Sequence, residues 1–135
     1  MSKNKEIADR AWQLLDAQDF GRLEEVLAPN VEFRMGSQVI RGIPEFRAMC
    51  EGWWAAFPDL HHEVTAEMES GDSYACELSM VGTHTGTMHT PQGDLPATGK
   101  KIRFLSCDYV TVDRGKIVRW HAYPDMPGLL AQLGA

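Results

Sequence analysis

Residues 100–123 read KKIRFLSCDYVTVDRGKIVRWHAY, and this is the most informative stretch of the chain. Two runs rich in β-branched and aromatic residues flank the Gly-containing turn at 113–115, which predicts a β-hairpin. Three polar side chains, Ser106, Asp108 and His121, interrupt the two strands. A polar side chain that faces a core needs a partner or a cavity. These residues are therefore the first candidates for function.

Length and composition predict one soluble globular domain over residues 1–135, with 44% hydrophobic and 24% charged residues. The net charge of −6 argues against nucleic acid or an anionic membrane surface as a partner. The N-terminus lacks the apolar core of a signal peptide, and no apolar run approaches the ~18 residues of a membrane span. Three cysteines without short Cys or His spacing predict free thiols, without structural zinc or a disulfide framework. We therefore expect a cytoplasmic protein.

Hydrophobic periodicity predicts helices early in the chain and consecutive strands later. Helices are expected over residues 4–18, 20–27, 44–57 and 127–133, and strands over residues 31–35, 38–41, 60–69 and 74–81 and in the hairpin. Residues 82–99 contain six Gly or Pro and predict a strand end followed by a long loop. This order favours an α+β fold in which a curved sheet wraps around helices.

Five short motifs occur in an order that resembles one family: FPDL (57–60), GTHTG (82–86), TGK (98–100), DRGKIV (113–118) and GLLAQLG (128–134). The chain is similar in this way to the SnoaL-like polyketide cyclases of the nuclear-transport-factor-2-like superfamily. The resemblance implies a cone: a strongly bent antiparallel sheet packed on three N-terminal helices, with a deep apolar pocket. It also implies a site without cofactors and a homodimer formed through the outer sheet face, where Tyr109, His121 and Tyr123 would lie.

The resemblance further implies that the even-numbered residues of the C-terminal strands face the pocket, since side chains alternate along a strand. The expected substrate-binding residues are Phe33, Met35, Trp53, Phe57, Met80, Phe104, Ser106, Trp120 and Ala122. Aromatic walls of this kind suit an apolar or polycyclic small molecule. Aromatic residues also fill ordinary cores, so the ligand is not identified by them.

Asp108 is the main catalytic candidate. A carboxylate that faces an apolar cavity has its charged form desolvated, which raises its pKa toward the range useful for proton transfer at neutral pH. The alternative is a core Asp that only accepts hydrogen bonds, for example from Trp120. The resemblance implies that the cyclases carry an acid where this chain has Ala122, so Asp108 either takes over that role or the aldol cyclisation is absent.

His84 and Asp125 are the other catalytic candidates. His84 lies between two threonines at the start of the Gly-rich loop and could assist proton transfer at the pocket mouth. Its alternative role is a loop residue held by a Thr hydroxyl. Asp125 precedes Pro127 and the last helix, which favours an N-cap over a catalytic acid. No metal site is expected, because His84, His89 and Asp108 have no recognised ligand spacing.

Two functions stay open at this point. The first is a cofactor-independent cyclase or isomerase that uses general acid/base catalysis in an apolar pocket. The second is a non-catalytic protein that binds a small molecule in the same pocket. Ala122, Leu78 and Met80 favour the second, since the resemblance implies that superfamily enzymes keep polar groups at these positions.

Overall fold

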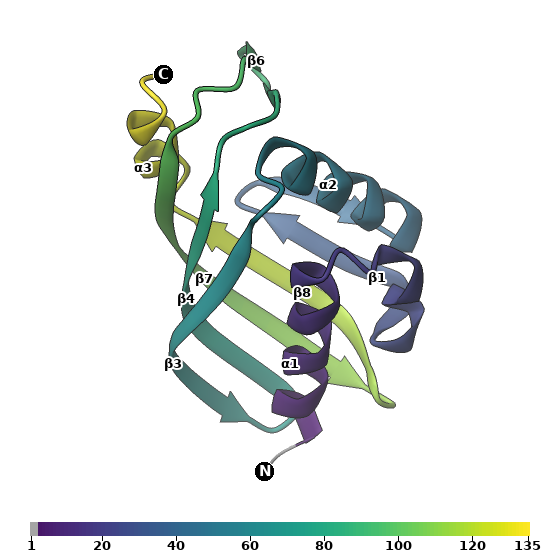
Figure 1. The fold of residues 1–135 in the computed structure, drawn as a ribbon. Helices are drawn as coiled ribbons and strands as arrows, with labels where there is room; N and C mark the ends of the chain where they lie inside the picture. Colours follow the sequence, from purple (N-terminus) through teal and green to yellow (C-terminus); the bar gives the residue numbers. More distant parts are fainter. Residues whose placement is uncertain (1–2) are drawn as a thin grey trace.

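The computed structural model describes residues 3–135 (Figure 1). Its elements are α1 (Lys3–Asp16), the 3₁₀ helix η1 (Phe20–Glu25), β1 (Leu27–Met35), β2 (Gln38–Arg41), α2 (Ile43–Ala56), β3 (His61–Ser70), β4 (Ser73–Thr83), β5 (Met88–Thr90), β6 (Gly93–Leu95), β7 (Lys101–Asp113), β8 (Lys116–Pro124) and α3 (Met126–Gln132). The predicted α+β class is confirmed. Within the described residues no helix is long and apolar enough to cross a membrane.

A six-stranded curved sheet carries the fold, in the order β2-β1-β8-β7-β4-β3. Its neighbouring strands are antiparallel except β1 and β8, which run parallel. Figure 1 shows α1 and α2 over the same side of this sheet, with α3 beside the first residues of β7. The space between the helices and the sheet is where a site can form.

Alternation along β7 separates a core face from a solvent face, because successive side chains of a strand point to opposite sides. The even-numbered residues from Ile102 to Val112 are buried, whereas the odd-numbered ones are exposed or half-buried. In the β7–β8 ladder, Asp108 lies opposite Ala122 and Val110 lies opposite Trp120. The hairpin predicted from its turn therefore also fixes which side chains face the helices.

Two local differences from the sequence expectation have identifiable causes. The second helix ends at Glu25 rather than at Leu27, because Leu27 already pairs with Ile117 of β8. The register of this ladder shifts between Leu27 and Glu32, which lets β1 contain Pro29. The segment expected to be a loop contains the small β5–β6 hairpin, in which Thr90 pairs with Gly93.

Candidate active site

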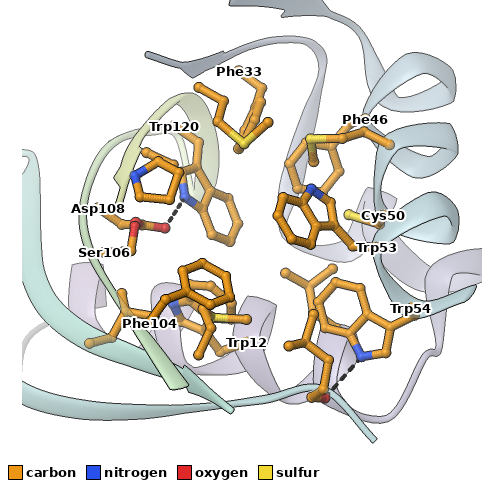
Figure 2. A pocket seen from close by; sticks show the side chains of 18 residues that line it. Trp12, Phe33, Phe46, Cys50, Trp53, Trp54, Phe104, Ser106, Asp108 and Trp120 are labelled. Carbon is orange, nitrogen blue, oxygen red and sulfur yellow. Dashed lines mark hydrogen bonds between the residues drawn. The ribbon is translucent and has the colours of Figure 1, made fainter. Parts of the chain in front are cut away.

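An apolar cavity of about 80 Å³ lies between the helices and the sheet, and we call it the inner cavity. Its wall consists of Trp12, Leu15, Phe33, Met35, Phe46, Met49, Cys50, Trp53, Trp54, Leu60, Leu78, Met80, Phe104, Ser106, Asp108, Trp120, Ala122 and Pro124. Figure 2 shows Trp53 of α2 facing Trp120 and Asp108 of the sheet across this space. Apart from the indole N–H groups and the Cys50 thiol, the side chains of Ser106 and Asp108 supply the polar atoms of the wall.

Asp108 is held by two hydrogen bonds from its own hairpin. Ser106 Oγ donates to Oδ1 at 2.6 Å, and Trp120 Nε1 donates to Oδ2 at 2.9 Å. The side chain is buried, with 5% of the residue exposed. Burial raises the pKa of Asp108 above its ordinary value of 3.8, and the two hydrogen bonds oppose this shift. The arrangement gives an oriented carboxyl group with a raised pKa in an aromatic cavity, which is what proton transfer requires.

The raised pKa of Asp108 determines how this residue changes the stability of the fold with pH. Between pH 3.8 and the pKa in the folded state, the folded protein keeps on Asp108 a proton that the unfolded chain releases. The folded state then binds more protons than the unfolded state. The stability associated with Asp108 is therefore present at low pH and lost as the pH rises through the folded pKa.

Ala122 leaves the wall opposite Asp108 without a second acid. The two residues are paired across the β7–β8 ladder, and both line the inner cavity. Leu78 and Met80 of β4 extend the same wall and are also apolar. Among the described residues of this wall, Asp108 is thus the one carboxylate.

Eight of the nine expected substrate-binding residues line the inner cavity, and Phe57 does not. Phe57 is fully buried one layer behind the wall, with its ring centroid 6.2 Å from that of Trp53. The chain leaves α2 at this point, because Ala56 is the last helical residue. Phe57 therefore supports Trp53 instead of contacting a ligand in the inner cavity.

His84 lies behind Phe57 and not at the mouth of the cavity, which corrects the expected placement. Its exposed fraction is 0%, and its ring centroid is 5.2 Å from that of Phe57. The Thr98 backbone N–H donates to Nδ1 at 3.3 Å, and the Thr98 hydroxyl lies 3.0 Å from the same atom. Burial lowers the pKa of His84. The side chain therefore anchors the loop that returns at Thr98.

Asp125 and His121 have partners outside the inner cavity. Asp125 Oδ1 accepts from the Gly128 backbone N–H at 3.0 Å, as an N-cap of α3 does. His121 Nε2 lies 2.8 Å from Glu32 Oε2. Neither residue belongs to the wall around Asp108. In residues 3–135 no three His, Cys, Asp or Glu side chains gather in a way that could hold a metal ion.

Sequence reasoning missed a partly buried group next to the cavity, formed by Trp12, Asp16 and His62. His62 Nδ1 lies 2.6 Å from Asp16 Oδ2, and the imidazole stacks on Trp12 with ring centroids 4.5 Å apart. Trp12 in turn meets the edge of Trp120 at 5.3 Å. His62 pairs with Met80 in the β3–β4 ladder and thus shares its face. The pairing of His62 with Met80 would have placed His62 beside the cavity, but this pairing could be used only once the register of β3 and β4 was known.

Comparison with known proteins gives a consistent assignment. A family model described as SnoaL-like polyketide cyclase matches residues 5–133. A Jannaschia sp. CCS1 protein described as a candidate SnoaL-like polyketide cyclase superimposes with a TM-score of 0.88, at 19% identity, over 98% of this chain and 92% of its own. IdmH from Streptomyces antibioticus, described as a candidate polyketide cyclase, superimposes with a TM-score of 0.83 at 22% identity, over 99% of this chain and 100% of its own.

A third solved structure shares the fold under a different description. AclR from Streptomyces galilaeus, described as a candidate hydroxylase, superimposes with a TM-score of 0.83 at 22% identity, over 99% of this chain and 97% of its own. Likeness at such identities shows the fold alone, and one fold hosts many reactions. Comparison with curated proteins finds no match.

Proposed function

Because this chain belongs to the SnoaL-like polyketide cyclase family over residues 5–133, we propose that it is a cofactor-independent enzyme of the cyclase or isomerase type. Its substrate would be an apolar small molecule with a carbonyl group, bound in the inner cavity. The observation that carries this proposal is the carboxyl group of Asp108, which is buried in an aromatic wall and oriented by Ser106 and Trp120.

Asp108 can move a proton without giving up either of its hydrogen bonds. Each carboxylate oxygen accepts one bond from the hairpin and retains a second lone pair. Such a lone pair can take a proton from a carbon next to a carbonyl group, and the C–H electrons then pass to the carbonyl oxygen as an enolate. In a ring closure the enolate carbon attacks a second carbonyl carbon. The resulting alkoxide recovers the proton from Asp108, so the carboxyl group ends as it began.

Trp120 acts on the carboxyl group and not on the enolate, because its Nε1–H is already committed to Asp108 Oδ2. Its ring packs between Trp12, with centroids 5.3 Å apart, and Phe46, with centroids 5.5 Å apart. These contacts fix the direction of the indole N–H. Trp120 is therefore a positioning residue for Asp108 in this proposal.

Hydrogen exchange at carbon tests the proposal without knowledge of the natural product. The wild-type protein is incubated in D₂O with a panel of uncharged aromatic ketones and β-keto esters, and loss of the C–H signal is followed by NMR. We expect exchange above the buffer rate for at least one member, because the first step needs only Asp108 and a bound carbonyl compound. Exchange at the buffer rate throughout the panel would contradict an acid/base function.

The second candidate function is binding without catalysis. Both oxygens of Asp108 already accept hydrogen bonds, and its cross-strand neighbour is Ala122. A carboxyl group satisfied in this way can be structural. Ligand binding in the absence of any carbon exchange would favour this second function.

A homodimer is part of the proposal and would use the outer face of the sheet. Leu105, Tyr109 and Tyr123 are exposed there by 62%, 40% and 52%. Exposed apolar groups that gather on one face favour an interface. Light scattering measures the molecular mass in solution, which distinguishes a dimer from a monomer.

The free thiols of Cys50, Cys76 and Cys107 support a location in the reducing cytoplasm.

A further inference from the structure

A second cavity adjoins the inner one, and the two share part of their walls. This outer cavity has a volume of about 270 Å³ and lies between α2 and the β5–β6 hairpin. Its wall includes Gln38, Ala48, Met88 and Thr90. Met35, Met49 and Trp53 line both cavities and thus separate them.

Neither cavity alone has the size of an ordinary small-molecule site, which is roughly 300–1,000 Å³. The inner cavity, at about 80 Å³, is also smaller than the ~150 Å³ of an engineered cavity that admits benzene. A carbonyl compound with one ring and a side chain cannot be enclosed by the inner cavity alone. The chemistry at Asp108 therefore needs space from the neighbouring cavity.

The residues of the shared wall are suited to moving. Two of them are methionines, whose unbranched side chains change rotamer easily and adapt to irregular shapes. Trp53 is half-buried and stacks on Phe104 with ring centroids 5.9 Å apart. Its Nε1–H donates no hydrogen bond to an acceptor in residues 3–135 and is thus available to a ligand carbonyl oxygen. Rotation of these side chains would join the two cavities without a backbone change.

The residues that line the two cavities favour an uncharged ligand. Among residues 3–135 no Lys or Arg lines either cavity, so an anionic group would meet no cation there. In the inner cavity the ionisable oxygen-bearing side chain is Asp108, which supplies no positive charge in either protonation state. In the outer cavity His89 is exposed and lies 2.7 Å from Asp94 through Nδ1, so it is already paired. Burying an unpaired charge is strongly unfavourable.

We propose that the two cavities form one binding site, joined when the side chains of the shared wall move, for an uncharged two-part molecule: a flat ring beside Asp108 that extends past the shared wall, and an apolar arm in the outer cavity. This inference deepens the proposed function and rests on it for the reacting group. It excludes substrates whose arm carries a carboxylate, phosphate or sulfonate inside the site. It assigns Met35, Met49 and Trp53 as the movable partition.

N-Phenyl-1-naphthylamine is a suitable probe, because it is uncharged, has two aromatic parts and fluoresces in apolar surroundings. 8-Anilino-1-naphthalenesulfonate has the same skeleton with a sulfonate and is its charged counterpart. We expect the wild-type protein to bind the neutral probe at least about tenfold more tightly than the charged one, since the sulfonate has no cation to meet. Equal affinities, or tighter binding of the sulfonate, would overturn the assignment of charge.

Three variants test whether one ligand occupies both cavities. Ala48→Phe fills the outer cavity from an exposed helix position, and Ala55→Phe makes the same change on the same helix outside both cavities. Ala122→Val narrows the inner cavity. We expect Ala48→Phe and Ala122→Val each to weaken binding of the neutral probe by about tenfold or more, with Ala55→Phe unchanged, because steric filling removes apolar contact area.

Unchanged binding in either Ala48→Phe or Ala122→Val would overturn the joined site, provided that circular dichroism shows the variant folded. If Ala122→Val unfolds, Cys50→Met narrows the same cavity from α2 and gives the same readout. Probe binding does not depend on proton transfer. Failure of carbon exchange with these binding results intact would therefore remove the proposed reaction and leave the two-part site.

Discussion

Asp108→Asn lowers the rate of carbon exchange by about 100- to 10,000-fold relative to the wild-type protein, the usual effect of removing a general acid/base. The amide has nearly the shape of the carboxyl group but cannot accept a proton from carbon. The side chain keeps an oxygen that can accept one of the hydrogen bonds from Ser106 or Trp120. The measurement is the NMR exchange assay in D₂O with the panel member that the wild type exchanges fastest.

Asp125→Asn is the matched control for that loss. It makes the same chemical change at the exposed N-cap of α3, where Asn caps as well as Asp. We expect wild-type exchange from this variant. The assignment of Asp108 is wrong if Asp108→Asn exchanges at the wild-type rate, and a large loss in Asp125→Asn alone would move the acid to the end of β8.

Gly86→Ala is expected to lower the free energy of unfolding by about 3 kcal/mol or more, because the added Cβ would overlap a backbone carbonyl. The atom it would meet is the oxygen of Ala55, in the last turn of α2. The close approach is held by the backbone N–H groups of Thr85 and Gly86, which donate to Ala56 O at 3.2 and 3.1 Å. Backbone atoms cannot rotate away as a flexible side chain can. Urea denaturation monitored by Trp fluorescence measures the change.

Gly52→Ala is the control for position 86. Gly52 lies inside α2, and a Cβ there would meet nothing within 4 Å. Alanine in a helix is more stable than glycine by about 0.5–1 kcal/mol, so we expect a small gain. Equal effects of the two substitutions would show that the loop does not need the close approach to α2.

Close contacts of Gly82 and Gly86 explain why residues 82–86 form a recognisable motif. The sequence pattern contains both glycines but not the reason for them, which is close approach to the end of α2 at Gly86 and to the residues that follow α2 at Gly82. A Cβ at Gly82 would press on Phe57 at 3.2 Å and on Asp59 at 3.3 Å. The same contacts connect this segment to the motif at 57–60. Motifs far apart in sequence are thus one structural unit here.

The pocket-facing side of the hairpin could be predicted because it depends on local alternation. Ser106, Asp108 and Trp120 lie where that periodicity and the family resemblance place them. The positions of Phe57 and His84 could not be predicted, because they depend on how α2 ends against the loop. The pairing of Asp16 with His62 joins residues 46 positions apart. Such contacts follow from the tertiary arrangement and leave little trace in local sequence.

The position of β1 in the sheet also could not be predicted from the local sequence. Its residues alternate as a strand should, but the parallel pairing with β8 brings Phe33 beside Trp120. This pairing closes the wall of the inner cavity on the side away from β4. Parallel partners are distant in sequence and have no turn between them, so the hydrophobic pattern alone does not identify them.

In the proposed mechanism Asp108 carries a movable proton, because its carboxyl group is buried in an aromatic wall. The direct measurement is an NMR titration of protein labelled with ¹³C at the Asp carboxyl carbons, with Asp108→Asn used to identify the signal. We predict a midpoint clearly above the ordinary 3.8, because burial raises the pKa of Asp108 more than its hydrogen bonds lower it. A midpoint at or below 3.8 would show that the hydrogen bonds dominate, and Asp108 would then be a structural carboxylate.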